Sequence, residues 1–465
     1  MSENTTPASA TAPENTAPAP IAPENAPPAS TAAPENAPPA STAAPENKAP
    51  AAPPAGKPPE KKPPAPSTVG DLLKPSDIVV GGKYIGWSVR EDVRKEGGSG
   101  GLVTSVLAGA LEKGLVENVV VLKKSNQYEA VPVLTSDVND VYASVGSMHM
   151  LISNPTKYLR QFQNDTTIAL AAKPCDVRGI REQQKRNVID GDKIFTIGLN
   201  CGGTMMPYKI RKVTEEVYGV NPDEVRAEEI EKGKLILETA DGEHHSQSID
   251  ELEEEDNGRR ENCRYCVVKI ATNADLACGN WGVMPDYLGK GTFVEVMTEK
   301  GAEFLRNAVA GGYAEVKEAS EPAAEARGKV NGIMLKMSAK TKEDIFVPLK
   351  SQTLQEFKKE LENCISCGAC KAVCPPCACG PEAKCTVFND PVDNYDISLF
   401  HMIRFLHLMD SCVGCGQCSD VCPADIPLAR LYRKFADPMQ DELNFITGMD
   451  DRTPPFFDVK LEEVQ

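Results

Sequence analysis

Residues 364–375 read CISCGACKAVCP, and residues 412–423 read CVGCGQCSDVCP. Both stretches follow the pattern C-x2-C-x2-C-x3-C-P, in which three closely spaced thiolates hold one 4Fe-4S cluster and the fourth, next to proline, reaches the other cluster. The repeated pattern therefore predicts a ferredoxin-like domain with two 4Fe-4S clusters over residues 349–435. The predicted ligands are Cys364, Cys367, Cys370 and Cys422 for one cluster, and Cys412, Cys415, Cys418 and Cys374 for the other.

A zinc-binding interaction module is one alternative to the two clusters, because zinc also binds C-x2-C pairs. Zinc requires neither the third cysteine nor the proline that both copies carry, so we favour iron-sulfur clusters. Three further cysteines between the motifs exceed what two clusters need. They are either buried structural thiols or ligands or redox groups whose partner the sequence does not name: Cys377, Cys379 and Cys385.

The composition indicates a soluble protein of two or three domains whose cysteines are reduced and not paired in disulfides. The chain has 465 residues, 16 cysteines and a net charge of −17. Since cellular thiols keep intracellular cysteines reduced, metal or cluster ligation explains this cysteine content better than disulfides do. No apolar run is long enough to span a membrane, and the N-terminus lacks a signal-peptide pattern. We therefore expect a cytoplasmic protein, and its acidity argues against nucleic acid as a partner.

The two ends of the chain differ in composition from the middle. Residues 1–68 are rich in proline and alanine, and their few large apolar side chains predict a disordered tail. Its repeated Pro-Glu-Asn is either a solvating spacer, which we favour, or a docking motif. Residues 436–465 are expected to form a C-terminal extension.

Between them, residues 69–348 alternate short apolar runs with helical stretches, which predicts an α+β domain with a mixed sheet. Expected strands cover residues 118–122, 166–172 and 193–199. Apolar residues at helical spacing predict a helix from Leu102 that ends before Gly114. The acidic run 250–256 is expected to be a solvated surface loop.

Five cysteines lie upstream of the ferredoxin-like motifs. Four of them belong to three separate loops that could meet at one edge of the sheet and form a third four-thiolate site. The alternative is that they are small buried apolar residues. The four are Cys175, Cys201, Cys263 and Cys266, and Cys278 is left over.

Two glycine-rich turns are candidates for cofactor binding. Residues 97–101 precede the Leu102 helix, where free backbone N–H groups suit a phosphate, although a flexible connector fits the same residues. Residues 279–282 read GNWG, where a flat ring system could approach the backbone. A tryptophan packed in the core is the alternative there.

Several stretches in a fixed order resemble the coenzyme F420 hydrogenase/dehydrogenase β-subunit family, whose members contain flavin and react with a deazaflavin coenzyme. The stretches are SGGLVTSVLAGALEKG, KPCDVRGIREQQK, GLNCGG, NCRYC and ADLACGNWG. The C-terminal CISCGACKAVCPPCACGPEAKC and HLMDSCVGCGQCSDVCPADIPLAR are similar to the form found in archaeal formate dehydrogenases. The resemblance spans about residues 75–435.

The resemblance implies FAD and one 4Fe-4S cluster within residues 69–348, in addition to the two C-terminal clusters. It assigns the upstream cluster to the four cysteines named above. Met148-His149 departs from the family's usual Lys-Tyr, which puts a cofactor role for His149 in doubt. The residues implied in cofactor binding are Ser99, Gly100, Gly101, Thr104, Gly146, Ser147 and Asn280.

In function, the resemblance implies a formate dehydrogenase subunit that passes electrons to coenzyme F420 as its substrate. Clusters carry one electron, the deazaflavin exchanges a hydride, and a flavin does both, so FAD is the converter. The implied partner is a catalytic α subunit with molybdenum or tungsten, and a larger complex such as heterodisulfide reductase is a further possible partner. The alternatives are the β subunit of an F420-reducing hydrogenase and a flavin-free iron-sulfur wiring subunit.

Overall fold

The computed structural model describes residues 72–150, 153–162, 165–231, 233–349, 354–378 and 397–456. The chain divides into two units, Met1–Pro64 and Ala65–Gln465, and every described residue belongs to the second. The predicted tail, Cys379 and Cys385 lie outside the described residues. No helix among those described is both long and apolar enough to cross a membrane.

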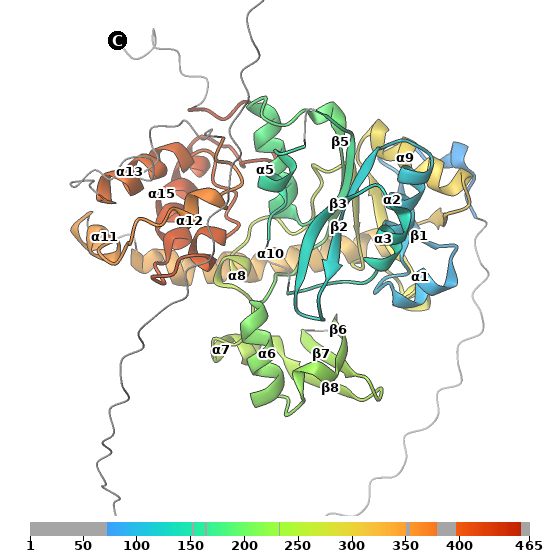
Figure 1. Ribbon diagram of the computed structural model, residues 1–465, viewed down its shortest axis with the longest axis horizontal. Helices are drawn as coiled ribbons and strands as arrows, with labels where there is room; N and C mark the ends of the chain where they lie inside the picture. Colours follow the sequence, from blue (N-terminus) through green and yellow to red (C-terminus); the bar gives the residue numbers. More distant parts are fainter. Residues whose placement is uncertain are drawn as a thin grey trace, which may run out of the picture. The chain divides into compact units, whose positions relative to one another are not determined.

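An eight-stranded mixed sheet lies at the centre of the second unit, with strand order β11-β1-β10-β9-β5-β4-β2-β3 (Figure 1). The neighbours β2, β4, β5 and β9 run parallel, and the other pairs are antiparallel. The parallel strands end at one edge, called here the carboxyl edge, so the loops that follow them gather there. The strands are β1 (Lys83–Ser88), β2 (Asn118–Lys124), β3 (Ala130–Thr135), β4 (Ile168–Ala172), β5 (Ile194–Leu199), β9 (Leu276–Gly279), β10 (Thr292–Val296) and β11 (Ala314–Glu318).

The predicted mixed sheet is confirmed, and the three expected strands correspond to β2, β4 and β5. The helix expected from Leu102 is α2 (Leu102–Glu112). It packs on one face of the sheet with α3 (Val138–Ala143) and α9 (Glu299–Ala310), while α4 (Thr156–Leu159) and α5 (Pro174–Lys185) cover the other face (Figure 1).

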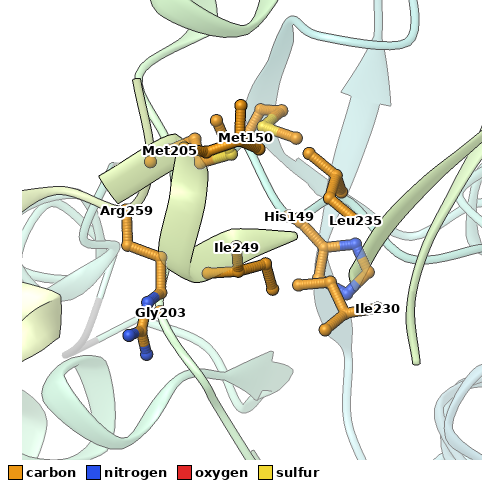
Figure 2. Close-up of a pocket in the computed structure, with 10 residues that line it drawn as sticks. His149, Met150, Gly203, Met205, Ile230, Leu235, Ile249 and Arg259 are labelled. Carbon is orange, nitrogen blue, oxygen red and sulfur yellow. The ribbon is translucent and has the colours of Figure 1, made fainter. Parts of the chain in front are cut away.

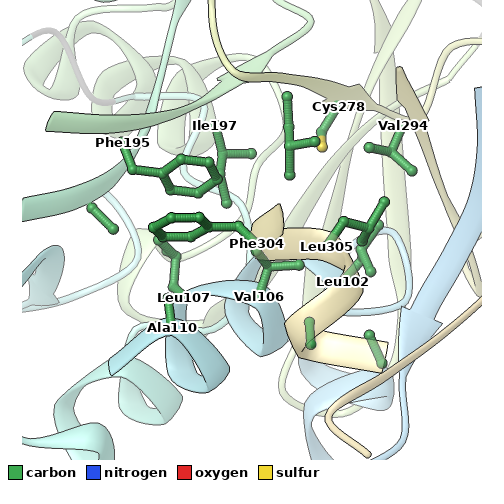
Figure 3. Close-up of a cluster of buried hydrophobic side chains, with 14 of the residues drawn as sticks. Leu102, Val106, Leu107, Ala110, Phe195, Ile197, Cys278, Val294, Phe304 and Leu305 are labelled. Atoms are coloured by element: carbon green, nitrogen blue, oxygen red, sulfur yellow. The ribbon is translucent and has the colours of Figure 1, made fainter. Parts of the chain in front are cut away.

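Both faces of the sheet are apolar because helices cover both. Along β4, Ala169 packs into the α2 face, and Ile168 and Leu170 pack into the α5 face, as alternating side chains of a strand do. Figure 3 shows the α2 face, where Phe195 of β5 stacks on Phe304 of α9 with ring centroids 3.6 Å apart.

A smaller antiparallel sheet consists of β6 (Val225–Glu231), β7 (Lys234–Thr239) and β8 (His244–Ser248). The helices α6 (Pro207–Glu216) and α7 (Ile249–Glu254) accompany it. The loop expected over residues 250–256 is wrong in its larger part, because α7 occupies it. Ser248 caps this helix by accepting a hydrogen bond from the Glu251 N–H, its first turn carries acidic residues, which favour a helix N-terminus, and Leu252 is buried.

The C-terminal region is helical and packs against α5. Gln183 donates a hydrogen bond to the Pro375 carbonyl at 2.7 Å, and Arg178 donates to the Val413 carbonyl at 2.8 Å. The expected boundary at residue 435 falls inside α15 (Leu428–Glu442). The other helices here are α8 (Glu261–Arg264), α11 (Leu354–Glu360), α12 (Ala369–Ala372), α13 (Ile397–Leu408) and α14 (Gln417–Asp420).

The long helix α10 (Glu321–Leu349) links the sheet to this region. Near its start, Arg327 donates hydrogen bonds to the Glu295 carboxylate and to the Ala277 carbonyl. Further along, Lys342 forms an ion pair with Asp437 of α15 at 2.9 Å. The two halves of the second unit are therefore joined by specific polar contacts.

Candidate iron-sulfur and cofactor sites

The first ferredoxin set, Cys364, Cys367, Cys370 and Cys422, lines one cavity. Gly368, with φ 73°, lets the chain turn into α12 between two of these thiols. Phe400 and His401 of α13 line the same cavity, and Cys367 is exposed while Cys370 is buried. The structure thus brings the four thiols predicted for one cluster together around one cavity.

The second ferredoxin set, Cys412, Cys415, Cys418 and Cys374, is more deeply buried. Burial raises the pKa of the Cys418 thiol well above its usual value, and negative charge on the other three thiols raises it further. Burial raises the pKa of Cys374 to about 11. A thiol in such a place is either inert or is held as a thiolate by bound metal.

The upstream set, Cys175, Cys201, Cys263 and Cys266, lies beside the carboxyl edge. Cys175 begins α5 after β4, Cys201 follows β5, and the other two lie in and after α8. Burial raises the pKa of Cys201 to about 11, and negative charge on Cys263 and Cys266 adds to the rise. The three predicted loops therefore meet.

Positive side chains surround the upstream set. Lys173 forms an ion pair with Asp176 at 2.9 Å, and negative charge on Cys175 and Cys201 also favours its charged form. Arg260 lies 3.8 Å from the Cys263 sulfur. Such cations offset the negative charge of thiolate ligands.

Arg260 also connects the upstream set to the second ferredoxin set. Its side chain donates to the Cys415 carbonyl at 2.7 Å and pairs with Asp420, and both charged groups are largely buried. Negative charge on Cys415 contributes to the raised pKa of Cys175. The two sets are therefore neighbours, whereas the thiols around Cys364 interact among themselves.

The three thiol sets suit iron-sulfur clusters better than they suit single metal ions. Among the residues that the structure describes, no three His, Cys, Asp or Glu side chains converge as one metal ion requires. The four thiolates of a 4Fe-4S cluster each bind a different iron, so they lie further apart than ligands of one ion. The first ferredoxin set, whose four thiols line one cavity without converging on a single point, suits that arrangement. Cys278 belongs to none of the sets, since it is buried among apolar side chains such as Ile197 and Val294 (Figure 3).

The residues expected to bind FAD phosphates lie at the carboxyl edge. Gly100 and Gly101 have φ of 74° and 70°, and a side chain at Gly100 would overlap the Lys290 carbonyl. The Ser99 carbonyl accepts a hydrogen bond from Thr292. Thr104 lies in the first turn of α2, where backbone N–H groups lack intrahelical acceptors. Free backbone N–H groups at a helix start suit an anionic phosphate, so FAD phosphate binding here stays a prediction.

The second expected segment joins the same place. A Cβ on Gly98 would lie 3.1 Å from the Ser147 hydroxyl, and a Cβ on Gly146 would lie 3.1 Å from the Lys124 ammonium. Asn280 follows β9 at the same edge, where its side chain accepts from Asn200, the residue before Cys201, at 3.3 Å. The expected cofactor residues therefore lie at the carboxyl edge, as the upstream set does.

His149 faces the smaller sheet instead. Figure 2 shows its ring near Ile230, Leu235 and Ile249, in a pocket that is otherwise mainly apolar. Its backbone N–H donates to the buried Glu228 carboxylate at 2.7 Å. Its ring Nδ1 lies 3.5 Å from the same carboxylate.

Sequence analysis did not identify several polar residues at the sites, among them Arg260, His401, Arg404 and Tyr432. The contacts of Arg260 with Cys415 and of His401 with Cys364, and those that join Tyr432 to α13, are made between segments far apart in the chain, so no local pattern pointed to them. Lys173 and Asp176 could have been identified from the sequence, because they lie next to Cys175 in the quoted KPCDVRGI stretch.

Comparison with known proteins gives three matching regions. Residues 83–159 and 165–322 match the N- and C-terminal parts of "Coenzyme F420 hydrogenase/dehydrogenase, beta subunit", and residues 360–426 match "4Fe-4S dicluster domain". The third match bears out the predicted two-cluster domain.

Individual relatives agree with these matches. The chain is 38% identical to the F420-dependent formate dehydrogenase subunit beta of Methanocaldococcus jannaschii, over 78% of this chain and 95% of the relative. It is 39% identical to the F420-dependent formate dehydrogenase 1 subunit beta of Methanococcus maripaludis, over 78% and 94%. A chain of the F420-reducing [NiFe] hydrogenase complex of Methanosarcina barkeri shares the fold, with a TM-score of 0.51 at 20% identity, covering 58% of this chain and 94% of that one. The protein therefore belongs to the coenzyme F420 hydrogenase/dehydrogenase β-subunit family.

Proposed function

We propose that this chain is the electron-transfer and F420-reducing β subunit of a formate dehydrogenase. Two relatives named as such subunits share 38% and 39% identity with it over nearly their whole length. A relative named as a hydrogenase β subunit matches at 28% over only 55% of this chain, so the hydrogenase alternative is less favoured. The proposed partner is a catalytic α subunit that oxidises formate at molybdenum or tungsten. A further complex such as heterodisulfide reductase is a possible second partner.

The observation that carries the proposal is the contact between the upstream set and the second ferredoxin set through Arg260. It supports a direct route from the second ferredoxin set to the carboxyl edge, where the expected flavin residues lie. When bound, three 4Fe-4S clusters would supply one-electron transfer, and FAD would convert electron pairs into a hydride for coenzyme F420.

The chain's own residues would hold and shield this route. The twelve thiols of the three sets would ligate the clusters, and the glycine-rich turn with Ser99 and Thr104 would bind the FAD phosphates. Arg260 and Lys173 would compensate the negative charge of the upstream thiolates. Burial of the second set would keep water away from the middle of the route.

The test uses the complete chain, purified without oxygen and without its partner. A dithionite-reduced viologen should reduce coenzyme F420 in its presence, and formate should not. Acid precipitation should release FAD, whereas a flavin-free wiring subunit would release none. Formate oxidation by the chain alone, or a folded chain without iron, would contradict the proposal.

A further inference from the structure

A chain of buried polar side chains ends on a thiol of the first ferredoxin set. Arg404 donates to the Tyr432 hydroxyl at 3.1 Å, this hydroxyl lies 3.0 Å from His401 Nδ1, and His401 Nε2 lies 3.4 Å from the Cys364 sulfur. His401 is 0% exposed, Tyr432 2% and Arg404 6%. A buried polar network whose members are hydrogen-bonded to one another is rigid and holds each side chain in one orientation.

The donor and acceptor roles follow from the chemistry of the three groups. Arginine can only donate, so the Tyr432 oxygen accepts from Arg404. A cluster-bound Cys364 thiolate cannot donate to His401 Nε2, so Nε2 is the protonated nitrogen, and Nδ1 accepts the hydrogen of the Tyr432 hydroxyl. The ring proton of a neutral His401 is then on Nε2, the nitrogen that faces sulfur. A Cys364 thiolate has no hydrogen of its own, so this contact is an N–H···S hydrogen bond.

Arg404 anchors the other end of this row of hydrogen-bonded side chains. Its second guanidinium nitrogen donates to the Cys370 carbonyl at 3.3 Å, so the same arginine is anchored to the backbone of the first ferredoxin set. His401 and Arg404 both lie on α13, three residues apart, and Tyr432 lies on α15. The packing of these two helices therefore sets the orientation of the imidazole.

The geometry points to His401 as a positioning residue that raises the reduction potential of the cluster bound by Cys364. A hydrogen bond to a ligand sulfur stabilises the negative charge that one added electron brings, and so favours the reduced form. The electron comes from the partner or from an added reductant, and no bond to hydrogen forms or breaks. This inference rests on the proposed cluster ligation by Cys364.

The test compares variants of the complete chain, isolated without oxygen, in redox titrations followed by electron paramagnetic resonance. His401→Leu removes the donor, and His401→Gln replaces the ring with an amide that can still donate. Tyr432→Phe keeps the aromatic ring of residue 432 but removes the hydroxyl that fixes the tautomer of His401. His407→Leu is the matched control, because His407 is exposed on the same helix. Iron and sulfide content is measured for each variant.

We expect His401→Leu to lower the potential of one cluster, with about a tenfold change in its reduction equilibrium, or about 59 mV for one electron. Tyr432→Phe should lower it less, and His401→Gln and His407→Leu should leave it near the wild-type value. Equal shifts of the potential in His401→Leu and His401→Gln would overturn the inference. An unshifted potential in His401→Leu, or in Tyr432→Phe, would overturn it as well.

Two further outcomes have a definite meaning. If His401→Leu fails to bind iron, Tyr432→Phe and His401→Gln decide the question, and an unchanged potential in Tyr432→Phe overturns the inference. A wild-type chain without iron would contradict the proposed function itself, whereas wild-type clusters with unshifted variants would contradict the role of His401 alone.

Discussion

Arg260 carries a positive charge into the contact between the upstream set and the second ferredoxin set. Its partners are the Asp420 carboxylate, the Cys415 carbonyl and the Thr204 hydroxyl. Burial raises the pKa of Asp420 even though Arg260 opposes the rise, so this carboxylate depends strongly on its partner. Removing one member of such a pair leaves an uncompensated buried charge.

We therefore expect Arg260→Met to destabilise the contact between the two regions by about 3–5 kcal/mol. Anaerobic thermal unfolding followed by circular dichroism should show an earlier transition. Lys95→Met is the control, because its ion pair with Glu91 is exposed and should contribute little to stability. Equal transition temperatures in the two variants would show that Arg260 contributes no more than a surface charge.

At the scale of single elements, α2 is flanked by two glycines with left-handed backbone but different surroundings. Gly100, before the helix, has φ 74° and lies against the Lys290 carbonyl. Gly114, after it, has φ 68°, and a Cβ added there would meet no atom within 4 Å. Alanine at either position bears the cost of a left-handed conformation, about 1–2 kcal/mol, but only Gly100 adds a collision with backbone.

Gly100→Ala should therefore lose bound FAD, while Gly114→Ala should retain it with a small loss of stability. The measurement is the ratio of flavin to protein after purification, together with the unfolding temperature. If both variants kept wild-type flavin content, the glycine-rich turn would not be a phosphate site. Equal flavin loss in both would point to general destabilisation.

The sequence predicted those elements whose signal is local. The ferredoxin motifs, α2, and strands β2, β4 and β5 depend on spacing and periodicity within short segments. The acidic run was misjudged because its charges suggested solvent, whereas the Ser248 cap and the buried Leu252 favour a helix. Capping was readable from the sequence, but burial of one leucine under the smaller sheet was not.

At the scale of the whole molecule, the decisive contacts join segments far apart in sequence. Arg260 reaches Cys415, Gln183 reaches Pro375, and His401 reaches Cys364. Spacing and the family resemblance assigned the thiols to three sets, but did not predict that the upstream set would lie beside the second ferredoxin set. Such adjacency depends on how α5, α10 and α15 pack, and no local pattern encodes it.

The iron inventory of the complete chain tests whether all three thiol sets are used. We expect oxygen-free material to contain about 12 iron and about 12 acid-labile sulfide per chain, four of each for every cluster. Cys263→Ala should lose about 4 iron, because the upstream set then lacks a ligand. Cys278→Ala is the matched control and should retain the full content, since Cys278 is packed in the apolar α2 face.

The same two variants distinguish loss of the link to the carboxyl edge from loss of formate oxidation on the catalytic partner. In complex with the catalytic partner, Cys263→Ala should lose formate-dependent reduction of coenzyme F420 but keep formate oxidation with an artificial acceptor, because only the link to the carboxyl edge is broken. Cys278→Ala should keep both activities. Full iron content in Cys263→Ala would mean that the upstream thiols do not hold a cluster, whereas an equal loss of iron in Cys278→Ala would point to general destabilisation.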